Sequence, residues 1–529
     1  MNRKILWADD EIELLKAHII FLEMKGYDLT PVTNGQDAIE LVKEQTFDAV
    51  LLDEMMPGGD GLSVLAEIKN HDPGLPVIMI TKSEEEHIMD DALGARISDY
   101  LIKPVNPSQI YMTLKRLLDS RQLRSERVSR EYTRQLNQNR LELMMGPDHE
   151  RWAALYASLA AWDIEIESFN DTGLFQIHAD QKREYGREFT KFVEQNYVSW
   201  LAGDGPKPQI IQSNKEKPVL SHRVLDHFVA PLLRKGERVY FIIIDCFRLD
   251  HWLAIESKLE ELFTIDRKYY FSILPTATPF CRNALFSGLL PRDIAGKYPE
   301  IWQSGGHDEM GMNQYEPELL EMYLSRNGIE LARKPHYEKI ITNEDGTNLL
   351  KRLGNLRDVS LISVVYNFID LLSHQRSESH ILREIAPDEA AFRSLTKSWF
   401  EHSVLLDILR QAAAEGATVV MTTDHGSVMG EKASIVRGDR TTSTNVRYKY
   451  GRNLKAEPAE VLIVEDSAVN SFGLPSIGLG STYLFAKNEH YLVYRNNYRQ
   501  YQKLFQNTLQ HGGISMEEMI LPVGVMRPL

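Results

Sequence analysis

Cysteine is scarce in this chain: Cys246 and Cys281 are the only two among 529 residues. Two cysteines are too few for a disulfide framework, which excludes the small disulfide-stapled secreted folds. No apolar run approaches the ~20 residues that a membrane-spanning helix needs, so no membrane segment is expected. The first stretch, MNRKILWADD, lacks the apolar core and the small-residue cleavage site of a secretory signal. The sequence therefore predicts a cytoplasmic protein.

Positive charge is also in deficit, because 75 acidic residues outweigh 60 lysines and arginines and give a net charge of −15. The excess lies mostly in residues 1–118, which hold 21 acidic and 11 basic residues. Residues 206–529 are almost neutral, so a local basic surface there could still attract phosphates. The bulk charge argues against extended DNA binding, and no helix-turn-helix or zinc-finger pattern follows the first domain. No sequence-specific DNA-binding domain is expected.

Hydrophobic patterning predicts α/β domains at both ends of the chain with helices between them. Residues 1–118 alternate short apolar runs with amphipathic stretches, which favours a doubly wound parallel sheet. Residues 119–205 read as a helical-bundle connector, and AGDGPKPQ marks its exit. Residues 206–529 form the third predicted domain.

The connector begins within one long predicted helix. Asn106 can cap a helix that has Pro107 in its first position, and neither proline nor glycine follows until Gly146. The amphipathic stretches DHERWAALYASLAAW and REFTKFVEQNYVSWL predict further helices.

Polar side chains gather where strands of the first domain are predicted to end. Asp9 and Asp10 follow the first strand, Asp53 follows the third, and Thr81 and Lys103 close the next two. Ligands of open α/β sheets bind at the carboxyl ends of the strands. Three carboxylates converging there would hold Mg²⁺, and the lysine would neutralise a phosphoryl group. The alternative is a set of solvated loop carboxylates, which five polar positions at the right strand ends disfavour.

In ADDE, LLDEMMPGGDG, ITKS and YLIKP, the first domain resembles the receiver domain of two-component response regulators over nearly its whole length. The resemblance implies that Asp53 is the phospho-acceptor, and that Asp9 and Asp10 bind Mg²⁺ with it. It also makes Thr81 and Tyr100 the switch residues and Lys103 the phosphate partner.

Between the two switch residues, Ser83 and Glu86 form a predicted capping box. They would open the helix that supplies a phosphorylation-dependent dimer face in this family. Phosphorylation is therefore expected to promote a homodimer.

Six metal-favouring side chains follow predicted strands or turns of the last domain: Asp245, Asp370, His374, Asp424, His425 and His511. A lone Asp-His pair after a strand is more often a capped turn than a ligand pair, but the complete set favours a metal centre. Mixed carboxylate and imidazole donors suit Zn²⁺ or Mn²⁺ better than Mg²⁺. Six donors are enough for two ions about 4 Å apart, an arrangement used in phosphoryl transfer.

A hydroxyl nucleophile is available in ILPTATPFCRNALFSGLLP. Thr278 precedes Pro279 at a predicted helix N-cap, where free backbone N–H groups favour an anionic phosphate. A threonine that merely caps its helix is equally consistent with the pattern. Spacing alone does not choose between Thr278 and Thr276.

In Asp245, PTATPF, DLLSH, TTDHG and HGGISMEEMILP, residues 238–525 resemble the PglZ-type branch of the alkaline phosphatase superfamily. The resemblance implies a catalytic Thr278 that attacks phosphorus and gives a phospho-threonine intermediate. One zinc ion would be held by Asp370, His374 and His511. The other would be held by Asp245, Asp424, His425 and the Thr278 oxygen.

The domain order is similar to that of the PorX-type response regulators of the type IX secretion system. This resemblance implies a two-zinc phosphodiesterase that hydrolyses oligonucleotides and is gated by Asp53 phosphorylation. It also implies a sensor histidine kinase and a sigma factor as partners. Two other functions stay open: a phosphorylation-switched scaffold that binds the sigma factor, and a phosphomonoesterase.

A basic stretch of the last domain, residues 432–455, contains two tyrosines and could stack bases and bind phosphates. Arg437, Arg447 and Lys449 are therefore candidate substrate contacts. A solvent-exposed loop whose basic residues pair with nearby acids explains the pattern as well.

Overall fold

The computed structural model forms two compact units, residues 1–139 with 166–174 and residues 140–165 with 175–529. The described residues are 3–56, 59–82, 97–167, 172–202, 217–303, 313–438, 445–495 and 498–529. The predicted Ser83–Glu86 capping box lies outside them. The predicted fold class is confirmed: an α/β receiver-type sheet comes first, long helices follow, and a larger α/β sheet comes last.

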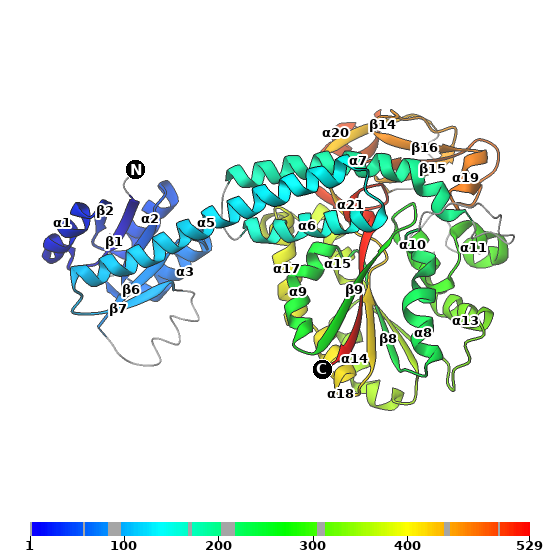
Figure 1. Ribbon diagram of the computed structural model, residues 1–529, viewed down its shortest axis with the longest axis horizontal. Coiled ribbons are helices and arrows are strands. Elements are labelled where there is room, and N and C mark those ends of the chain that lie inside the picture. Colours follow the sequence, from blue (N-terminus) through cyan, green and yellow to red (C-terminus); the bar gives the residue numbers. More distant parts are fainter. Residues whose placement is uncertain are drawn as a thin grey trace. The chain divides into compact units, whose positions relative to one another are not determined.

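The first unit is built on a five-stranded sheet in the order β2-β1-β3-β6-β7, and its paired strands are parallel (Figure 1). Strand β2, Tyr27–Val32, gives no apolar run, because it reads YDLTPV and exposes Asp28 and Pro31; the sequence implies it only as the strand that precedes the third one. The other strands are β1 (Arg3–Ala8), β3 (Ala49–Asp53), β6 (Val77–Thr81) and β7 (Asp99–Ile102).

Helices cover both faces of this sheet. Apolar residues of α2 (Gly35–Glu44) and α3 (Gly61–His71) pack on one face, against Leu6 and Val50. Leu22 of α1 (Lys16–Met24) and Ile110 of α5 (Pro107–Met144) pack on the other. The short elements that complete this unit are η1 (Ile12–Leu15), β4 (Met55–Met56) and β5 (Gly59–Asp60).

Helix α5 runs without interruption over Pro107–Met144, which confirms the long helix predicted from its cap. Oδ1 of Asn106 accepts a 2.9 Å hydrogen bond from the Ser108 backbone N–H. The boundary predicted at residue 118 falls inside this helix, because no glycine or proline breaks it there.

Two further helices, α6 (His149–Glu167) and α7 (Thr172–Leu201), agree with the predicted amphipathic stretches. Their aromatic residues belong to the core of the second unit. The rings of Trp152 and Phe189 meet edge to face with centroids 5.3 Å apart, and those of Trp200 and Phe271 do so at 5.6 Å. Most of the predicted connector is therefore built into the C-terminal unit.

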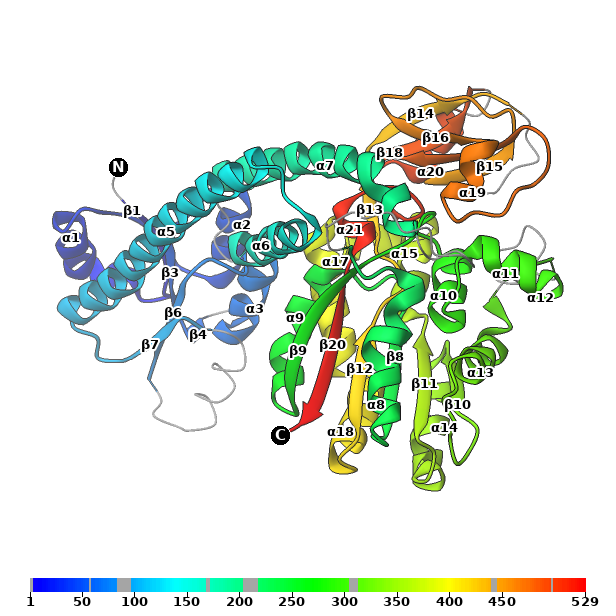
Figure 2. The same ribbon diagram turned by 45° about the vertical axis from the view of Figure 1, so that its right-hand side comes forward.

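The second unit has a six-stranded sheet in the order β10-β11-β8-β12-β20-β9, whose strands lie side by side in Figure 2. The first four strands are mutually parallel, whereas β20 and β9 run antiparallel to their neighbours. The strands are β8 (Val239–Ile244), β9 (Phe263–Phe271), β10 (His336–Ile340), β11 (Leu361–Tyr366), β12 (Thr418–Thr422) and β20 (Ile520–Pro528).

This sheet is the middle layer of a three-layer sandwich. Strand β8 is buried throughout and points Tyr240 and Ile242 to one face and Phe241 and Ile243 to the other. The first face packs on α9 (Leu249–Glu260), α14 (Asn343–Arg352), α17 (Glu389–Glu401) and α18 (Val404–Ala414). The second packs on α8 (Ala230–Arg234), α10 (Thr278–Ser287) and α13 (Glu316–Arg326).

Smaller helices complete this part of the second unit, and several of them add residues to its core. They are η2 (Ser221–Arg223), η3 (Leu225–Val229), α11 (Pro291–Lys297), α12 (Pro299–Gln303), η5 (Leu353–Leu356), α15 (Phe368–Glu378) and α16 (His380–Ile385).

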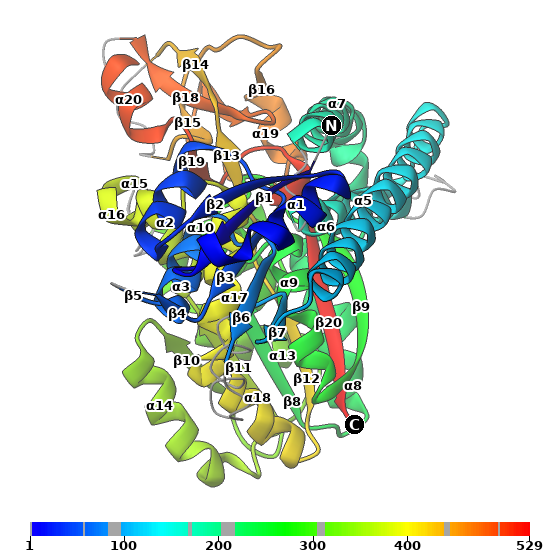
Figure 3. The ribbon, with the colours of Figure 1, turned by 90° about the vertical axis from the view of Figure 1, so that its left-hand side faces the viewer.

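A small β-rich region, residues 428–519, lies beyond the end of the sheet at which β8, β11 and β12 finish (Figure 3). Val428 pairs with Gln510 where β13 and β19 meet. Its strands are β13 (Val428–Gly430), β14 (Lys432–Val436), β15 (Tyr448–Arg452), β16 (Val461–Glu465), β17 (Ser481–Ala486), β18 (His490–Tyr494) and β19 (Thr508–Gln510). Its helices are α19 (Ser467–Ser471), α20 (Tyr498–Phe505) and α21 (Met516–Met519).

In the part of the chain that the structure describes, no helix combines the length and the apolar character needed to cross a membrane.

Candidate active site

The first unit brings its predicted acidic residues together at one edge of the sheet. Single carboxylate oxygens of Asp9, Asp10 and Asp53 lie within 4.8 Å of one another. Nζ of Lys103 lies 3.0 Å from Asp9 Oδ2 and 2.9 Å from Asp53 Oδ2. Asp9 and Asp53 are buried, and Asp10 is exposed. This cluster has the composition of a hard-cation site with a built-in counter-charge.

The environment of Asp53 favours its neutral form. Burial raises the pKa of Asp53, although the hydrogen bond from Lys103 acts in the opposite direction. Burial alone would lower the pKa of Lys103, but its two carboxylate partners raise it. A divalent cation among the three carboxylates would shift Asp53 back toward the ionised form that can attack a phosphoryl donor.

The two predicted switch residues differ in exposure. Thr81 is buried and donates its hydroxyl hydrogen bond to Glu54, the residue after Asp53. Tyr100 is 39% exposed at the edge strand β7. Thr81 is therefore one hydrogen bond away from the loop that follows the candidate phospho-acceptor.

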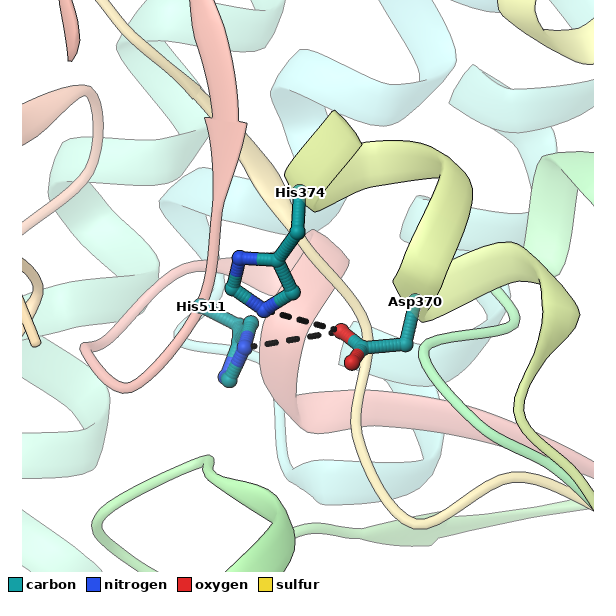
Figure 4. Close-up of side chains that lie close together, drawn as sticks. All are labelled: Asp370, His374 and His511. Carbon is teal, nitrogen blue, oxygen red and sulfur yellow. Dashed lines mark ion pairs between the residues drawn. The ribbon is translucent and has the colours of Figure 1, made fainter. Parts of the chain in front are cut away.

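In the second unit, the six predicted metal donors form two triads. Asp370 and His374 lie one turn apart on α15, and His511 approaches them from the turn after β19 (Figure 4). Asp370 Oδ1 is 3.4 Å from Nε2 of His374 and 3.6 Å from Nε2 of His511. The side chain of His374 is 50% exposed, whereas that of His511 is 4% exposed, so this triad opens to solvent on the His374 side.

The other triad is fully enclosed. Asp245 follows β8, and Asp424 and His425 follow β12, so the parallel strands deliver all three to the same end of the sheet. One ligand atom of each lies within 4.8 Å of the others, and each residue is 0% exposed.

Ring stacking joins the two triads. The rings of His425 and His511 lie 4.2 Å apart at an interplanar angle of 17°. The pairing of β13 with β19 explains this approach, because it brings the loop after Asp424 alongside the turn at His511. The same turn contains Gly512 at φ +122°, a conformation that a side chain would strain. The six donors therefore make one two-part centre.

Thr278 lies at this centre. Its Oγ1 is 2.9 Å from Nε2 of His425 and 3.5 Å from Oδ1 of Asp245. It was expected at the N-cap of its helix, but Ala277 holds that position and Thr278 is the first residue of α10. The reason is the extended backbone of Ala277, whose carbonyl accepts the first bonds of the helix. Thr276 instead bonds to the Gly513 carbonyl and is fully buried.

A buried cation that sequence patterns did not indicate stands behind the enclosed triad. Arg282, one turn after Thr278, places Nη1 2.7 Å from Asp245 Oδ2 and Nε 2.6 Å from Glu316 Oε1. Tyr337 donates its hydroxyl hydrogen bond to Glu316 as well. The only available signal was the i, i+4 spacing of Thr278 and Arg282, which is common in helices.

These contacts separate the pKa values of two adjacent carboxyls. Burial opposes ionisation of Asp245, but Arg282 lowers its pKa below the usual range. Burial and the neighbouring Asp245 raise the pKa of Asp424 well above its usual range. A metal ion beside Asp424 would act against this shift, because it favours the ionised carboxylate.

Lys339 is a second cation near the enclosed triad that sequence patterns did not indicate. Lys339 lies on β10, on the same face as Tyr337, whose hydroxyl meets Glu316. Burial and the nearby Arg282 lower the pKa of Lys339, while Glu316 and Asp245 act in the opposite direction. Among the described residues no ion pair is formed with Lys339, which leaves its ammonium group available to an anion.

The three predicted substrate contacts occupy different environments. Arg437 is exposed, as a substrate contact requires. Arg447 is 0% exposed, and its guanidinium is held by Glu518 and the His490 carbonyl. Lys449 is 1% exposed, and burial lowers its pKa to about 8. Residues 439–444 of the same stretch lie outside the described residues.

Arg447 is buried among protein partners and is not exposed to a substrate. Oε1 of Glu518, its partner, accepts a 2.9 Å hydrogen bond from the Gly513 backbone N–H, two residues after His511. The substrate contacts of residues 432–455 are predicted from composition alone. Composition does not reveal which arginine has a buried carboxylate partner.

Comparison with known proteins places these two centres in known families. The family model of the response regulator receiver domain matches residues 5–115, and that of the PorX response regulator linker domain matches residues 122–201. The family model of the BREX system PglZ alkaline phosphatase-like domain matches residues 224–526. None of the three is a DNA-binding domain.

Individual relatives resemble the receiver part. The transcriptional regulatory protein SrrA of Staphylococcus aureus is 32% identical over 118 residues, which are 22% of this chain and 48% of SrrA. The chain thus spans about half the length of the curated relatives it matches.

Solved structures of receiver domains match the same part. A CheY-like receiver domain protein of Methanospirillum hungatei is 26% identical, with 23% of this chain and 96% of that chain covered and a TM-score of 0.22. The receiver domain of a Francisella response regulator is 27% identical, with 22% and 98% covered and a TM-score of 0.22.

The molecule is a response regulator with a receiver domain and an alkaline phosphatase-like domain, both of which are metal-binding classes. Its receiver domain implies a phosphodonor such as a histidine kinase. The chain belongs to the PglZ alkaline phosphatase-like family, in the PorX-type arrangement of receiver, linker and PglZ domain.

Proposed function

We propose that this chain is a zinc-dependent phosphodiesterase whose nucleophile is Thr278 and whose activity is gated by phosphorylation of Asp53. The observation that carries the proposal is the meeting of two donor triads beside one hydroxyl. His425 contributes to it twice, because its ring stacks on His511 and its Nε2 lies 2.9 Å from Thr278 Oγ1.

The residues present suit two divalent cations. Oδ1 of Asp370 and Oδ2 of Asp424 are buried oxygens that accept no hydrogen bond from the described residues. Such acceptors are costly in a protein interior unless a cation or a donor meets them. Asp370, His374 and His511 would hold one zinc ion. Asp245, Asp424 and His425, with the Thr278 oxygen, would hold the other.

The mixture of donors favours zinc in this centre. Each triad offers at least one imidazole nitrogen together with carboxylate oxygen, which suits Zn²⁺ better than the oxygen-preferring Mg²⁺. The receiver cluster offers carboxylates alone and suits Mg²⁺. We therefore expect two zinc ions in the second unit and one magnesium ion in the first.

The chain's own residues fix the chemistry. Zinc would supply positive charge that stabilises the alkoxide form of Thr278. The same charge would stabilise the negative charge of the phosphoryl oxygens in the transition state. Oγ1 of Thr278 forms a bond to phosphorus while the bond to the leaving oxygen breaks, which gives a phospho-threonine. Water then attacks phosphorus and releases the threonine oxygen. Arg282 keeps Asp245 ionised throughout, because their separation is 2.7 Å.

The substrate class is proposed from the resemblance and from the surrounding charge. Lys339 and the exposed Arg437 offer cations that could meet neighbouring phosphates of an oligonucleotide. The PorX-type domain arrangement supports a role in type IX secretion, with a sensor histidine kinase upstream and a sigma factor as a further partner. Phosphorylation of Asp53 would promote dimerisation of the receiver domain.

The deciding experiment compares Thr278→Val with wild type. Thr347, a partly exposed threonine on helix α14, provides the matched control Thr347→Val. We expect about two zinc ions per chain and turnover of bis-p-nitrophenyl phosphate in wild type and control, and no turnover after Thr278→Val. Turnover that survives Thr278→Val, together with less than one zinc per chain, would contradict the proposal. Parallel assays with p-nitrophenyl phosphate and short oligonucleotides would separate monoesterase from diesterase activity.

The same variants test the scaffold alternative. A scaffold that binds a sigma factor would retain partner binding after Thr278→Val and would show no turnover in wild type.

A further inference from the structure

The second unit contains a chain of charged side chains, partly buried at the linker and fully buried at Arg248, that neither the donor triads nor Thr278 uses. It begins on the two linker helices, where Nζ of Lys182 on α7 lies 2.9 Å from Oδ2 of Asp163 on α6. The same ammonium group lies 3.7 Å from Oε2 of Glu389, the first residue of α17. Glu389 in turn pairs with Nη1 of Arg248, the residue before α9. The chain of contacts therefore runs from the linker into the catalytic domain.

Arg248 is the point at which this network meets the catalytic loop. Its Nη1 donates a 3.3 Å hydrogen bond to the carbonyl of Ser427, two residues after His425. Its Nε and Nη2 each donate a 2.9 Å bond to Asp250, and the side chain is 2% exposed. A guanidinium held at three sides is rigid, so its position fixes the Ser427 carbonyl.

The loop between His425 and Ser427 has no room to relax away from Arg248. A Cβ atom built on Gly426 would lie 1.9 Å from the Glu517 carbonyl oxygen and 3.3 Å from Cγ of Arg248. Gly426 also donates its backbone N–H to the Glu518 carbonyl. A displacement of Arg248 would therefore be transmitted along the backbone to His425, and from there to the hydroxyl of Thr278.

The linker charges are needed for this arrangement. Burial would lower the pKa of Lys182, but Asp163 and Glu389 raise it, so the ammonium form is strongly favoured. Burial would raise the pKa of Asp163, but Lys182 lowers it. Without Lys182 the two partly buried carboxylates of Asp163 and Glu389 would repel each other, and Glu389 would lose one of the two cations that hold it in place.

We propose that Lys182 and Asp163 of the linker helices are positioning residues for the catalytic loop 424–427, acting through Glu389 and Arg248. The linker then contributes to the active centre, because a movement of α6 or α7 changes the position of the catalytic loop. This inference rests on the proposed function, because it assigns the loop to a zinc-dependent phosphodiesterase.

The test uses the full-length chain and the variants Lys182→Met and Lys182→Arg. Lys191→Met is the matched control, because Lys191 lies on the same helix but is 60% exposed and, among the described residues, forms an ion pair with Glu188 alone. Three quantities are measured: the melting temperature, the affinity for zinc in competition with a chelator, and kcat/KM for bis-p-nitrophenyl phosphate. Loss of a residue that orients metal ligands typically costs about 10- to 100-fold in metal affinity or activity.

We expect Lys182→Met to weaken the binding of one of the two zinc ions and to lower kcat/KM by about 10-fold or more. Lys182→Arg should restore most of both losses, and Lys191→Met should match wild type. A folded Lys182→Met variant with wild-type zinc affinity and wild-type kcat/KM overturns the inference, even if its melting temperature is lower.

Asp163→Asn keeps the inference testable if Lys182→Met does not fold, because it preserves the side-chain shape and removes the charge. Its zinc affinity and kcat/KM are expected to fall as well, and unchanged values overturn the inference. If wild type binds two zinc ions but shows no turnover, the proposed phosphodiesterase is wrong, while the zinc-affinity comparison still decides the positioning role.

Discussion

Replacing Arg282 tests how the enclosed triad is held together. Arg282→Met would leave Asp245 and Glu316 buried without their shared cation, since both partners lie within 2.7 Å of the guanidinium. Removing one partner of a buried ion pair costs about 3–5 kcal/mol, because the remaining charge stays desolvated. At a denaturant slope of about 3 kcal/mol/M in urea, this loss lowers the unfolding midpoint by about 1–1.7 M.

The assay is urea unfolding of chelator-treated protein, followed by tryptophan fluorescence. The double variant Arg282→Met with Glu316→Gln restores the local charge balance and should recover part of the lost stability. With zinc bound, the loss should shrink, because the cation also neutralises Asp245. A midpoint within 0.3 M of wild type for the metal-free single variant, a change of less than about 1 kcal/mol, would refute the reasoning.

The remaining predictions address each centre in turn. Asp53→Ala should abolish dimerisation induced by acetyl phosphate, measured by light scattering, while zinc content stays at the wild-type value. His511→Ala should remove about one zinc ion per chain, measured by atomic absorption, because only one triad contains it. Lys339→Met should lower kcat/KM for a phosphodiester by about 10-fold or more without loss of zinc, since a charged hydrogen bond contributes about 1.5–3 kcal/mol. Asp163→Asn should destabilise the protein at pH 7 more than at acidic pH. The depressed pKa of Asp163 stabilises the fold above its unfolded pKa of about 3.9, and this stabilisation disappears as pH falls toward the folded value. Equal destabilisation of the Asp163→Asn variant at pH 7 and pH 3 would contradict this prediction.

The parts of the fold that follow regular patterns could be predicted from the sequence. Strand β8 is an unbroken apolar run before Asp245, and α5 has a cap and no internal breaker before Gly146. The sequence implies strand β2 only by counting and does not locate it, because it alternates polar and apolar residues and contains Pro31. Apolar runs in a sequence indicate strands that are buried on both faces. Edge strands that bury only one face are therefore harder to predict from such runs.

Donor residues could be predicted because each follows an apolar strand or sits in a short motif. Their partners could not, because a salt bridge such as Arg282 with Glu316 joins positions 34 residues apart through the fold. The same limit applies to Arg447, which looked like a substrate contact from composition but is buried against Glu518. Sequence spacing indicates what a residue can bind, and three-dimensional packing decides whether a protein partner already occupies it.

The charge balance of the centre links metal binding to folding. Asp245, Asp370, Asp424 and Glu316 would together carry four negative charges, against one each on Arg282 and Lys339. Burial and the neighbouring Asp245 raise the pKa of Asp424, which shows how strongly this excess opposes a further negative charge. Two divalent cations would reverse the sign and leave a net charge of about +2, which favours an anionic phosphoryl group at Thr278. Because zinc binds the ionised form of Asp424, whose pKa is raised, zinc affinity should fall as pH decreases, and the stability conferred by zinc should fall with it.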